Sequence, residues 1–248
     1  MIDLAIVIPT LNEERYIGYL LSSIARQTIQ PKEVVVVDAF SQDKTEEEVK
    51  KWVRRIPQLK FYQIHKDTIS RQRNFGVKKS KSSRILFLDA DTALIDDDTL
   101  EKYMEEVEKK NAAIAVACNY PLSEHWKDKA YFEAANLTTK VGKHIWPVAV
   151  GINLFCNRDV FEELKGFDEK IKVGEDVEMV QRFAKNGYLY EVLREPKIHT
   201  SVRRLRKEGR IRFVLMMINS FFAAHIFGYK KNPVVREYEF GKHPPMES

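Results

Sequence analysis

Short apolar runs alternate with helix-like patterns through the first half of the chain. Four runs predict strands that are buried on both faces: "LAIVIP", "EVVVVDA", "KFYQIH" and "RILFLDAD". Apolar residues recur at helical spacing after the first run, where Ile17, Leu20, Leu21 and Ile24 follow one another, and helical segments also follow the other three. Strands separated by helices predict an α/β fold with a mostly parallel central sheet and helices on both faces.

The alternation becomes less regular after about residue 111. "AAIAVACNYP" and "VAVGINLFCN" predict further strands, and helices are predicted from "SEHWKDKAYFEAANLTTKVGKH", "RDVFEELKGF" and "GEDVEMVQRFAKNG". No linker rich in Gly, Ser or Pro divides the chain. We expect one domain over residues 1–200, with halves at 1–110 and 111–200, followed by a basic segment, an apolar helix and a tail over 201–248.

Polar residues follow every strand predicted in the first half, in "PTLNEE", "DAFSQDKT", "HKDTISRQRN" and "DADT". In an open parallel sheet, ligands bind beyond the carboxyl ends of the strands, where loops and helix N-termini converge. Turns need polar residues, but they do not need Asp38, Arg71, Arg73, Asp89 and Asp91 to converge on one edge. The pattern therefore predicts a ligand site at this edge.

Asp89 and Asp91 stand one residue apart at the end of the fourth predicted strand. Alone, such residues are often turn or helix caps. In an extended segment, however, side chains at i and i+2 lie on one side, so both carboxylates could bind one hard cation. The loop after the first strand has neither G-x-G-x-x-G nor G-K-[ST]. A diphosphate at this edge would thus need basic side chains and a divalent cation, Mg²⁺ or Mn²⁺.

Composition narrows the class of protein. The chain has 248 residues, 44% hydrophobic and 31% charged, with 10 Gly and 9 Pro, which is typical of an ordered globular protein. Cys118 and Cys156 lie in apolar runs, which favours buried free thiols. The charge is concentrated in "SVRRLRKEGRIR", without an aromatic platform beside it, so nucleic acid is not expected as a partner.

The apolar stretch from residue 211 to 229 is about as long as a minimal membrane span. Arg212, Asn219, Ser220 and His225 interrupt it, which disfavours a span. The basic segment before it has three interpretations: a solvated charged face, a clamp on a diphosphate, or a membrane-surface anchor. With the Phe- and Met-rich helix that follows, the third would give peripheral contact with an anionic inner leaflet through 201–229. The first strand has no signal-peptide pattern, so we expect a cytoplasmic protein, peripheral at the inner membrane face.

Five segments together resemble family 2 glycosyltransferases of the GT-A fold. They are "IVIPTLNEE", "VVVVDAFSQDKT", "SRQRNFG", "LFLDADT" and "GFDEKIKVGEDVEMVQRFAKNG", in the family's order, over roughly residues 4–190. The resemblance implies a nucleotide-sugar-binding half at 1–110 and an acceptor-binding half at 111–200. It implies a donor such as a UDP- or GDP-sugar, a divalent cation, and an acceptor that is a glycan, a lipid-linked molecule or a small molecule.

The resemblance also implies roles for single residues. Pro9, Thr10 and Glu13 would lie beside the nucleotide, Asp38 would bind the base, and Arg71 or Arg73 would contact base or phosphate. Asp91 would ligate the metal, with Asp89 near the ribose or the metal's water, and Asp176 would be the general base, with Glu175 as the second choice. His199 would be either a further metal ligand or an ordinary strand-end histidine, and Arg203 and Arg204 would bind the diphosphate or line an acceptor loop.

Those residue types suit displacement of a nucleoside diphosphate from an anomeric carbon. The leaving group needs charge stabilisation and the acceptor hydroxyl needs a base, so we expect a metal-dependent hexosyltransferase acting with inversion. "DAFS" departs from the family's two acids and glycine, with Ala39 and Phe40 in their place. A second hypothesis is therefore that the protein is a catalytically weak relative that binds nucleotide-sugar. A haloacid dehalogenase-type phosphatase is a weaker alternative, because Ala93 stands where its D-x-D-x-T motif has Thr.

Overall fold

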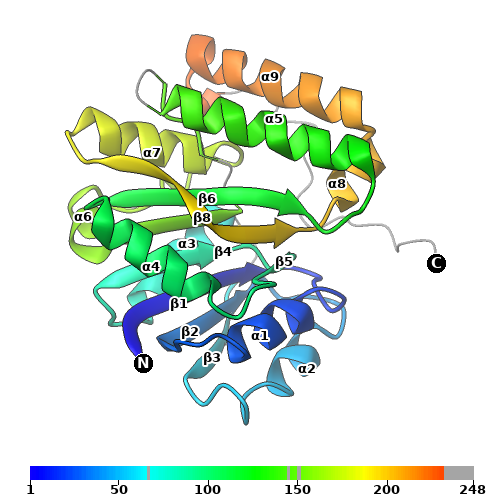
Figure 1. Cartoon of the computed structure of the whole chain (residues 1–248), viewed down its shortest axis with the longest axis vertical. Coiled ribbons are helices and arrows are strands. Elements are labelled where there is room, and N and C mark those ends of the chain that lie inside the picture. Colours follow the sequence, from blue (N-terminus) through cyan, green and yellow to red (C-terminus); the bar gives the residue numbers. More distant parts are fainter. Residues whose placement is uncertain (66–67, 144–145, 150–151, 232–248) are drawn as a thin grey trace.

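The computed structural model describes residues 1–65, 68–143, 146–149 and 152–231 (Figure 1). Over these residues the strands form one eight-stranded sheet in the order β3-β2-β1-β4-β7-β6-β8-β5. The strands are β1 (Ile2–Thr10), β2 (Pro31–Asp38), β3 (Leu59–Gln63), β4 (Arg84–Leu88), β5 (Thr92–Ala93), β6 (Ile114–Pro121), β7 (Asn153–Asn157) and β8 (Tyr190–Thr200).

Helices connect most of the strands. They are α1 (Ile17–Ala25), α2 (Thr45–Lys50), α3 (Ile69–Lys78), α4 (Thr99–Lys109), α5 (Trp126–Gly142), α6 (Arg158–Glu163), α7 (Glu175–Lys185), α8 (Arg203–Glu208) and α9 (Arg210–Phe227), with a 3₁₀ turn at Tyr229–Lys231. The helix predicted after the first strand begins only at Ile17, because residues 13–16 form a turn in which Tyr16 and Ile17 donate to the carbonyl of Glu13.

The first four long strands pair in parallel, as the sequence predicts. The second half adds the antiparallel pairs β4–β7, β6–β7 and β5–β8 and the parallel pair β6–β8. The sequence pattern did not predict the two-residue strand β5, or the extent of β8. The α/β class with a mostly parallel sheet is confirmed, and the division into halves at residue 110 stays a prediction.

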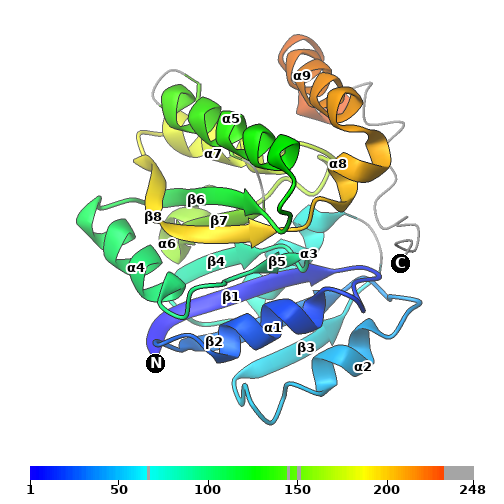
Figure 2. The same ribbon diagram turned by 45° about the vertical axis from the view of Figure 1, so that its right-hand side comes forward.

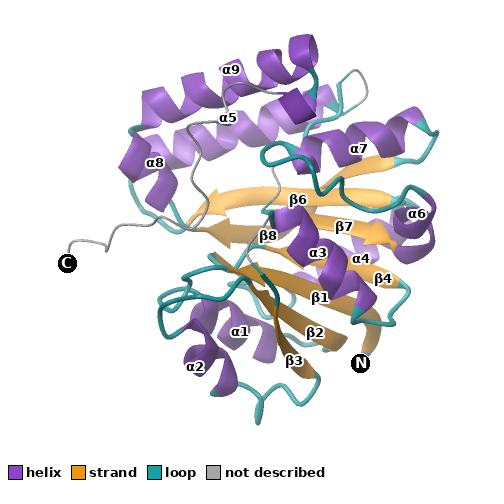
Figure 3. Cartoon of the chain, turned by 180° about the vertical axis from the view of Figure 1, so that it is seen from behind, coloured by secondary structure: helices purple, strands orange, loops and turns teal. Residues whose placement is uncertain are grey.

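Two apolar layers fix the helices to the sheet. Side chains of α1, α2 and α4 pack on one face with Leu4, Ile6 and Ile8 of β1. Side chains of α3, α6 and α7 pack on the other face with Val7 and Phe87, and Figure 3 shows α3 lying across it. Cys118 and Cys156 are buried free thiols, as expected. Because the strands are covered on both faces, their carboxyl ends are the accessible edge in the first half.

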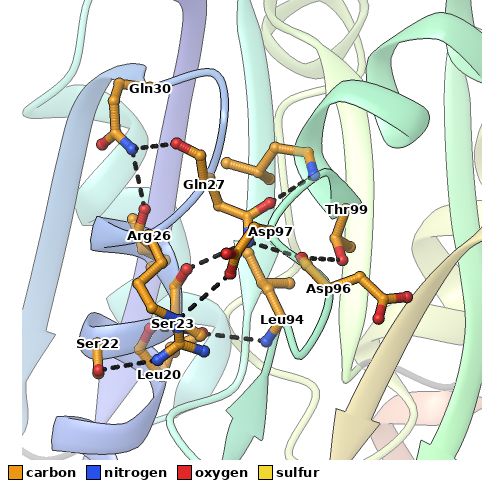
Figure 4. A network of polar contacts seen from close by, with 12 residues as sticks. Leu20, Ser22, Ser23, Arg26, Gln27, Gln30, Leu94, Asp96, Asp97 and Thr99 are labelled. Carbon is orange, nitrogen blue, oxygen red and sulfur yellow. Dashed lines mark hydrogen bonds and ion pairs between the residues drawn. The ribbon is translucent and has the colours of Figure 1, made fainter.

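A buried polar network fixes the segment after β5 to α1 (Figure 4). The backbone amide of Leu94 donates to Ser23 Oγ at 3.0 Å, and Gln27 Nε2 donates to the carbonyl of Asp96 at 2.9 Å. Gln27 Oε1 accepts from the backbone of Leu100 at 2.8 Å. These bonds hold both ends of the connection from the "DADT" turn to α4, so the turn itself has little freedom to shift.

Helices α5, α8 and α9 lie together at the end of the molecule away from α1 and α2 (Figures 1 and 2). A small apolar cluster of Phe132, Val202 and Leu205 joins α5 to α8. Asp128, a fully buried residue of α5, accepts from Arg210 Nε at 2.7 Å and so anchors the start of α9. In the described part of the chain, no helix combines the length and apolarity needed to cross a membrane.

Candidate active site

The carboxyl ends of β1 and β2 form one side of the site. Thr10 Oγ1 donates to Asp38 Oδ1 at 3.0 Å, and Ser41 donates to both Asp38 oxygens, from its hydroxyl and from its backbone amide. Gln72 Nε2 donates to the carbonyls of Thr10 and Val37. Asp38 is fully buried, and its hydrogen bonds with Ser41 hold the loop after β2 in place. Its predicted contact with a base stays a prediction.

Arg73 links the "DADT" turn to the start of α7. Its side chain is 2% exposed, and it forms ion pairs at 2.9 Å with Asp89 Oδ1 and with Glu175 Oε1. A buried guanidinium can donate to two carboxylates at once because its fork of N–H groups is planar and rigid. The neighbours of these partners, Asp91 and Asp176, are therefore held at the same edge of the sheet.

Arg203, at the start of α8, lies across the opposite side of the turn. It forms two hydrogen bonds to Glu13, at 2.6 and 2.8 Å, and its Nε lies 3.1 Å from Asp91 Oδ2. Its guanidinium also stacks 4.7 Å from the centroid of the Tyr16 ring. Burial raises the pKa of Glu13 to about 7, against the effect of Arg203, and the charge of Asp91 raises it further. One cation here neutralises two acids that a diphosphate would otherwise meet.

Asp176 occupies the first turn of α7, after Gly174, whose φ of 81° is left-handed. Burial, and next the negative charge of Glu175, raises the pKa of Asp176 to about 7, although Arg73 opposes the shift. The neighbouring Glu175 is bound by Arg73. A carboxylate with a pKa near neutrality suits a general base. The effect of burial on the pKa thus outweighs the effect of the positive end of the helix dipole, which lowers the basicity of a carboxylate.

His199 of β8 lies opposite Ala93 of β5, and the next pairs along are Thr92 with Thr200 and Asp91 with Ser201. Its Nδ1 is buried, with no hydrogen-bond partner among the residues that the structure describes. Burial lowers the pKa of His199, which favours the neutral imidazole that a metal needs. Its ring packs 5.6 Å from that of Tyr120, an ordinary core contact.

The potential metal ligands at this edge suit a hard divalent cation. They are the carboxylate oxygens of Asp89 and Asp91, with a neutral His199 on the neighbouring strand. Within residues 1–65, 68–143, 146–149 and 152–231, however, no three His, Cys, Asp or Glu side chains form a ready metal-binding group. Two carboxylates suffice for Mg²⁺ or Mn²⁺, which commonly take their other ligands from phosphate and water. His199 as a ligand stays a prediction.

The remaining predicted residues surround this centre. Pro9 is buried in β1 opposite Val37, and Arg71 is exposed on the first turn of α3, facing away from the buried Arg73. Arg204 follows Arg203 in α8. Burial raises the pKa of both Asp89 and Glu13, and the positive charge of Arg204 opposes that shift. Arg204 is thus electrostatically coupled to the acids of the site.

Two residues that were not predicted from the sequence complete this arrangement. Ser201 Oγ donates to Asp91 Oδ2 at 2.7 Å, and its amide donates to the Asp91 carbonyl at 3.0 Å. Tyr16 supports Arg203 through its ring. Ser201 could have been noticed from its place between His199 and Arg203 in "HTSVRR", but no local pattern indicates Tyr16.

Comparison with known proteins identifies the class. The family model "Glycosyl transferase family 2" matches residues 5–165. The chain therefore belongs to glycosyl transferase family 2, as the five segments suggested.

Individual relatives are similar over most of this chain. It is 26% identical over 211 residues to the minor teichoic acid biosynthesis protein GgaB of Bacillus subtilis (strain 168), covering 81% of this chain and 23% of GgaB. It is 26% identical over 200 residues to the O-antigen chain rhamnosyltransferase RfbN of Salmonella typhimurium, covering 75% of this chain and 62% of RfbN. The chain also spans 33% of the length of TarS, a poly(ribitol-phosphate) beta-N-acetylglucosaminyltransferase of Staphylococcus aureus (strain MW2).

Solved structures share the fold. The mannosyltransferase PcManGT from Pyrobaculum calidifontis, in complex with GDP-Man and Mn²⁺, matches with a TM-score of 0.73 at 22% identity. The match covers 94% of this chain and 66% of the PcManGT chain. S. aureus TarS 1-349 in complex with UDP has a TM-score of 0.64 at 20% identity, covering 96% and 76%. These likenesses establish the GT-A architecture of this chain.

Proposed function

We propose that this protein is a metal-dependent glycosyltransferase that moves a hexosyl group from a UDP- or GDP-sugar to an acceptor hydroxyl with inversion. The observation that carries the proposal is the double ion pair of Arg73 with Asp89 and Glu175. It holds the D-x-D turn and the first turn of α7 at one edge of the sheet, so groups for the donor and for the acceptor stand together. Family membership and the donors named for PcManGT and TarS support this choice of substrate class.

On the donor side, Asp91 would hold a divalent cation, with Asp89 beside it and His199 as a further candidate ligand. Such a cation supplies charge stabilisation for the departing diphosphate. Arg203 can exchange Glu13 and Asp91 for phosphate oxygens, because a guanidinium binds phosphate in the same bidentate way as carboxylate. Arg204 and Arg71 would add positive charge around the nucleotide.

On the acceptor side, Asp176 would take the proton of the attacking hydroxyl. Direct attack by an acceptor that Asp176 deprotonates is a single displacement and inverts the anomeric centre. Glu175 positions Asp176 and Arg73, and its own ion pair makes it the poorer base.

A thermal-shift panel of UDP- and GDP-sugars with and without Mn²⁺ tests the donor class, because ligands that bind only the folded state raise the melting temperature. We expect stabilisation that requires Mn²⁺, followed by slow donor hydrolysis or transfer. Donor binding without hydrolysis or transfer would favour the weakly catalytic relative that "DAFS" leaves open. The family match removes the reason to consider the haloacid dehalogenase-type phosphatase.

We further propose that α9 contacts an anionic membrane surface, which suits a lipid-linked acceptor. Its exposed apolar residues follow helical spacing along one face: Ile211 (79% exposed), Leu215 (54%), Ile218 (46%), Phe222 (60%) and Ile226 (73%). Exposed cations gather at its start, where Arg210 binds Asp128 of α5 and Arg206 of α8 binds Ser123 in the loop before α5. These exposed cations are Lys127, Lys129, Arg206, Lys207 and Arg212.

An apolar stripe with cations at one end complements anionic headgroups above an acyl boundary. The same surface of a second copy of this chain complements the α9 surface less well. In an antiparallel pair the cations of one α9 would meet residues 220–227 of the other, "SFFAAHIF", which contain no acid. The surface is therefore assigned to lipid.

Flotation with neutral and with phosphatidylglycerol-containing vesicles tests this surface. We expect binding only to the anionic vesicles, and high salt should abolish it. The triple variant Ile211→Ser, Leu215→Ser, Ile218→Ser should reduce this binding at least about tenfold. Ile95, which is 48% exposed and lies outside α9, provides the control, and Ile95→Ser should have no effect. Equal binding to both vesicles, or a dimer in sedimentation that the serine variant dissociates, would overturn the assignment.

A further inference from the structure

Phe40, in the loop after β2, has an unusual backbone conformation. Its φ is 55°, in the left-handed region that bulky side chains rarely adopt. Asn12, in the loop after β1, also has a positive φ, of 58°, but asparagine tolerates this conformation well. A phenylalanine is strained there, and the strain needs a physical reason.

Hydrogen bonds on both sides of Phe40 hold the loop. Ser41 is bound to Asp38, and Ser41 Oγ also accepts from the amide of Asn12 at 2.8 Å. The amide of Gln42 donates to Asn12 Oδ1 at 2.8 Å, while Gln42 Nε2 donates to the carbonyl of Phe40 at 3.0 Å. The loop geometry is thus overdetermined, and glycine would adopt it without strain. The backbone does not explain why the residue is phenylalanine, so the explanation lies in the ring.

Burial does not supply that explanation, because Phe40 remains 44% exposed. Its ring lies 5.3 Å from that of His65, just beyond the end of β3, and His65 is exposed as well. Both rings stand beyond the carboxyl ends of β2 and β3. The amide of Ala39, the residue before Phe40, donates to the carbonyl of Thr10. The rings therefore border the same sheet edge as Asp38 and the D-x-D turn.

We propose that Phe40, supported by His65, is the stacking platform for the nucleobase of the donor. This inference rests on the proposed function and adds the residue that holds the base. Nucleobases stack readily on aromatic side chains, with little dependence on which base is bound. Asp38, whose carboxylate is engaged by Thr10 and Ser41, then acts as the positioning residue that keeps Phe40 in its strained conformation. Strain retained at a ligand edge is typical of a functional loop.

The test compares nucleotides with a probe that has no base. UDP, GDP and inorganic pyrophosphate are titrated, each with Mn²⁺, into the full chain and its variants by calorimetry. Phe40→Asn keeps a residue that tolerates the loop conformation and removes the ring, and Phe40→Tyr keeps the ring. Lys165→Gly is the matched control, because Lys165 also has a positive φ, of 64°, in the loop after α6.

We expect Phe40→Asn to weaken UDP and GDP by on the order of tenfold and to leave pyrophosphate unchanged. Phe40→Tyr and Lys165→Gly should bind all three probes as the unchanged chain does. Unchanged UDP and GDP affinity in Phe40→Asn, or an equal loss for pyrophosphate, overturns the platform while the proposed donor class stands. If the unchanged chain binds pyrophosphate but neither nucleotide, the donor class itself is wrong, and the platform with it.

Discussion

Arg203 and Asp91 form an ion pair, with Nε 3.1 Å from Oδ2, at the position where the proposed metal and diphosphate would meet. The same guanidinium binds Glu13, so without donor the acids of the edge are neutralised by a side chain of the protein itself. This arrangement reduces the repulsion that the two adjacent, largely buried carboxylates would otherwise generate. A divalent cation at the proposed position would compete with Arg203 for Asp91.

Arg203→Ala should therefore change metal and donor binding in opposite directions. Without donor, Mn²⁺ should bind the variant more tightly, because Asp91 loses a competing cation. With Mn²⁺ present, UDP or GDP should bind about ten- to a hundredfold more weakly, since a charge-assisted bond to phosphate contributes about 1.5–3 kcal/mol. Calorimetry measures both, with the exposed Arg206→Ala as control. Unchanged Mn²⁺ affinity would show that Arg203 does not compete at this site.

Asp91→Asn should abolish Mn²⁺-dependent donor binding, because the amide has lost the charge that a hard cation requires. The thermal shift given by a UDP- or GDP-sugar with Mn²⁺ should disappear. Asp96→Asn, at an exposed acid beyond β5, should keep it. Donor binding with the same metal dependence in Asp91→Asn would place the metal elsewhere.

Asp176→Asn should leave donor binding intact and reduce transfer by at least about a hundredfold, the smallest usual contribution of a general base. In the unchanged protein, transfer should increase as the pH rises through about 7, because the pKa of Asp176 is raised to about 7 and only its ionised form accepts a proton. The pH–rate profile of transfer checks this. An acidic limb that survives in Asp176→Asn would assign the base to another group.

The same raised pKa predicts an effect on stability. A carboxyl whose folded pKa of about 7 exceeds its ordinary value of 3.8 favours the folded state most at low pH, and that stability is lost as the pH rises towards 7. Asp176→Asn should therefore melt at a higher temperature than the unchanged chain at pH 8, by a few degrees, on the order of 2–4 °C per kcal/mol. The excess should shrink at pH 5. Asp96→Asn should show no such pH-dependent excess.

Arg73→Ala should destabilise the fold strongly. Removing one partner of a buried ion pair leaves Asp89 and Glu175 without compensation, which typically costs about 3–5 kcal/mol, or about 10 °C in a chain of this size. Arg73→Lys should recover only part of this, since an ammonium lacks the fork that reaches both acids. Thermal unfolding of both variants, with the exposed Arg71→Ala for comparison, measures the effect. Equal melting temperatures for Arg73→Ala and Arg71→Ala would contradict the bridging role.

The order of apolar runs and polar turns along the chain was sufficient to predict the first half of the fold and the sheet edge at which the candidate site residues lie. Strands buried on both faces read as continuous apolar runs, and the carboxyl ends of parallel strands must share an edge, so Asp38, Asp89 and Asp91 could be placed there from order alone. The five segments likewise predicted the family that the comparison confirmed. The two-residue strand β5 and the extent of β8 escaped prediction, because a strand that short has no hydrophobic period of its own.

The pairing of the charged side chains became visible only in the folded chain. Arg73 contacts Glu175, 102 residues away, and Arg203 contacts Glu13, 190 residues away, and no local pattern encodes such distant partners. The fold also gives the neighbouring acids Asp176 and Glu175 different surroundings. Arg73 binds Glu175, while burial raises the pKa of Asp176. Ion pairs and pKa values depend on what the folded chain brings within a few ångströms, and that is a property of packing rather than of sequence order.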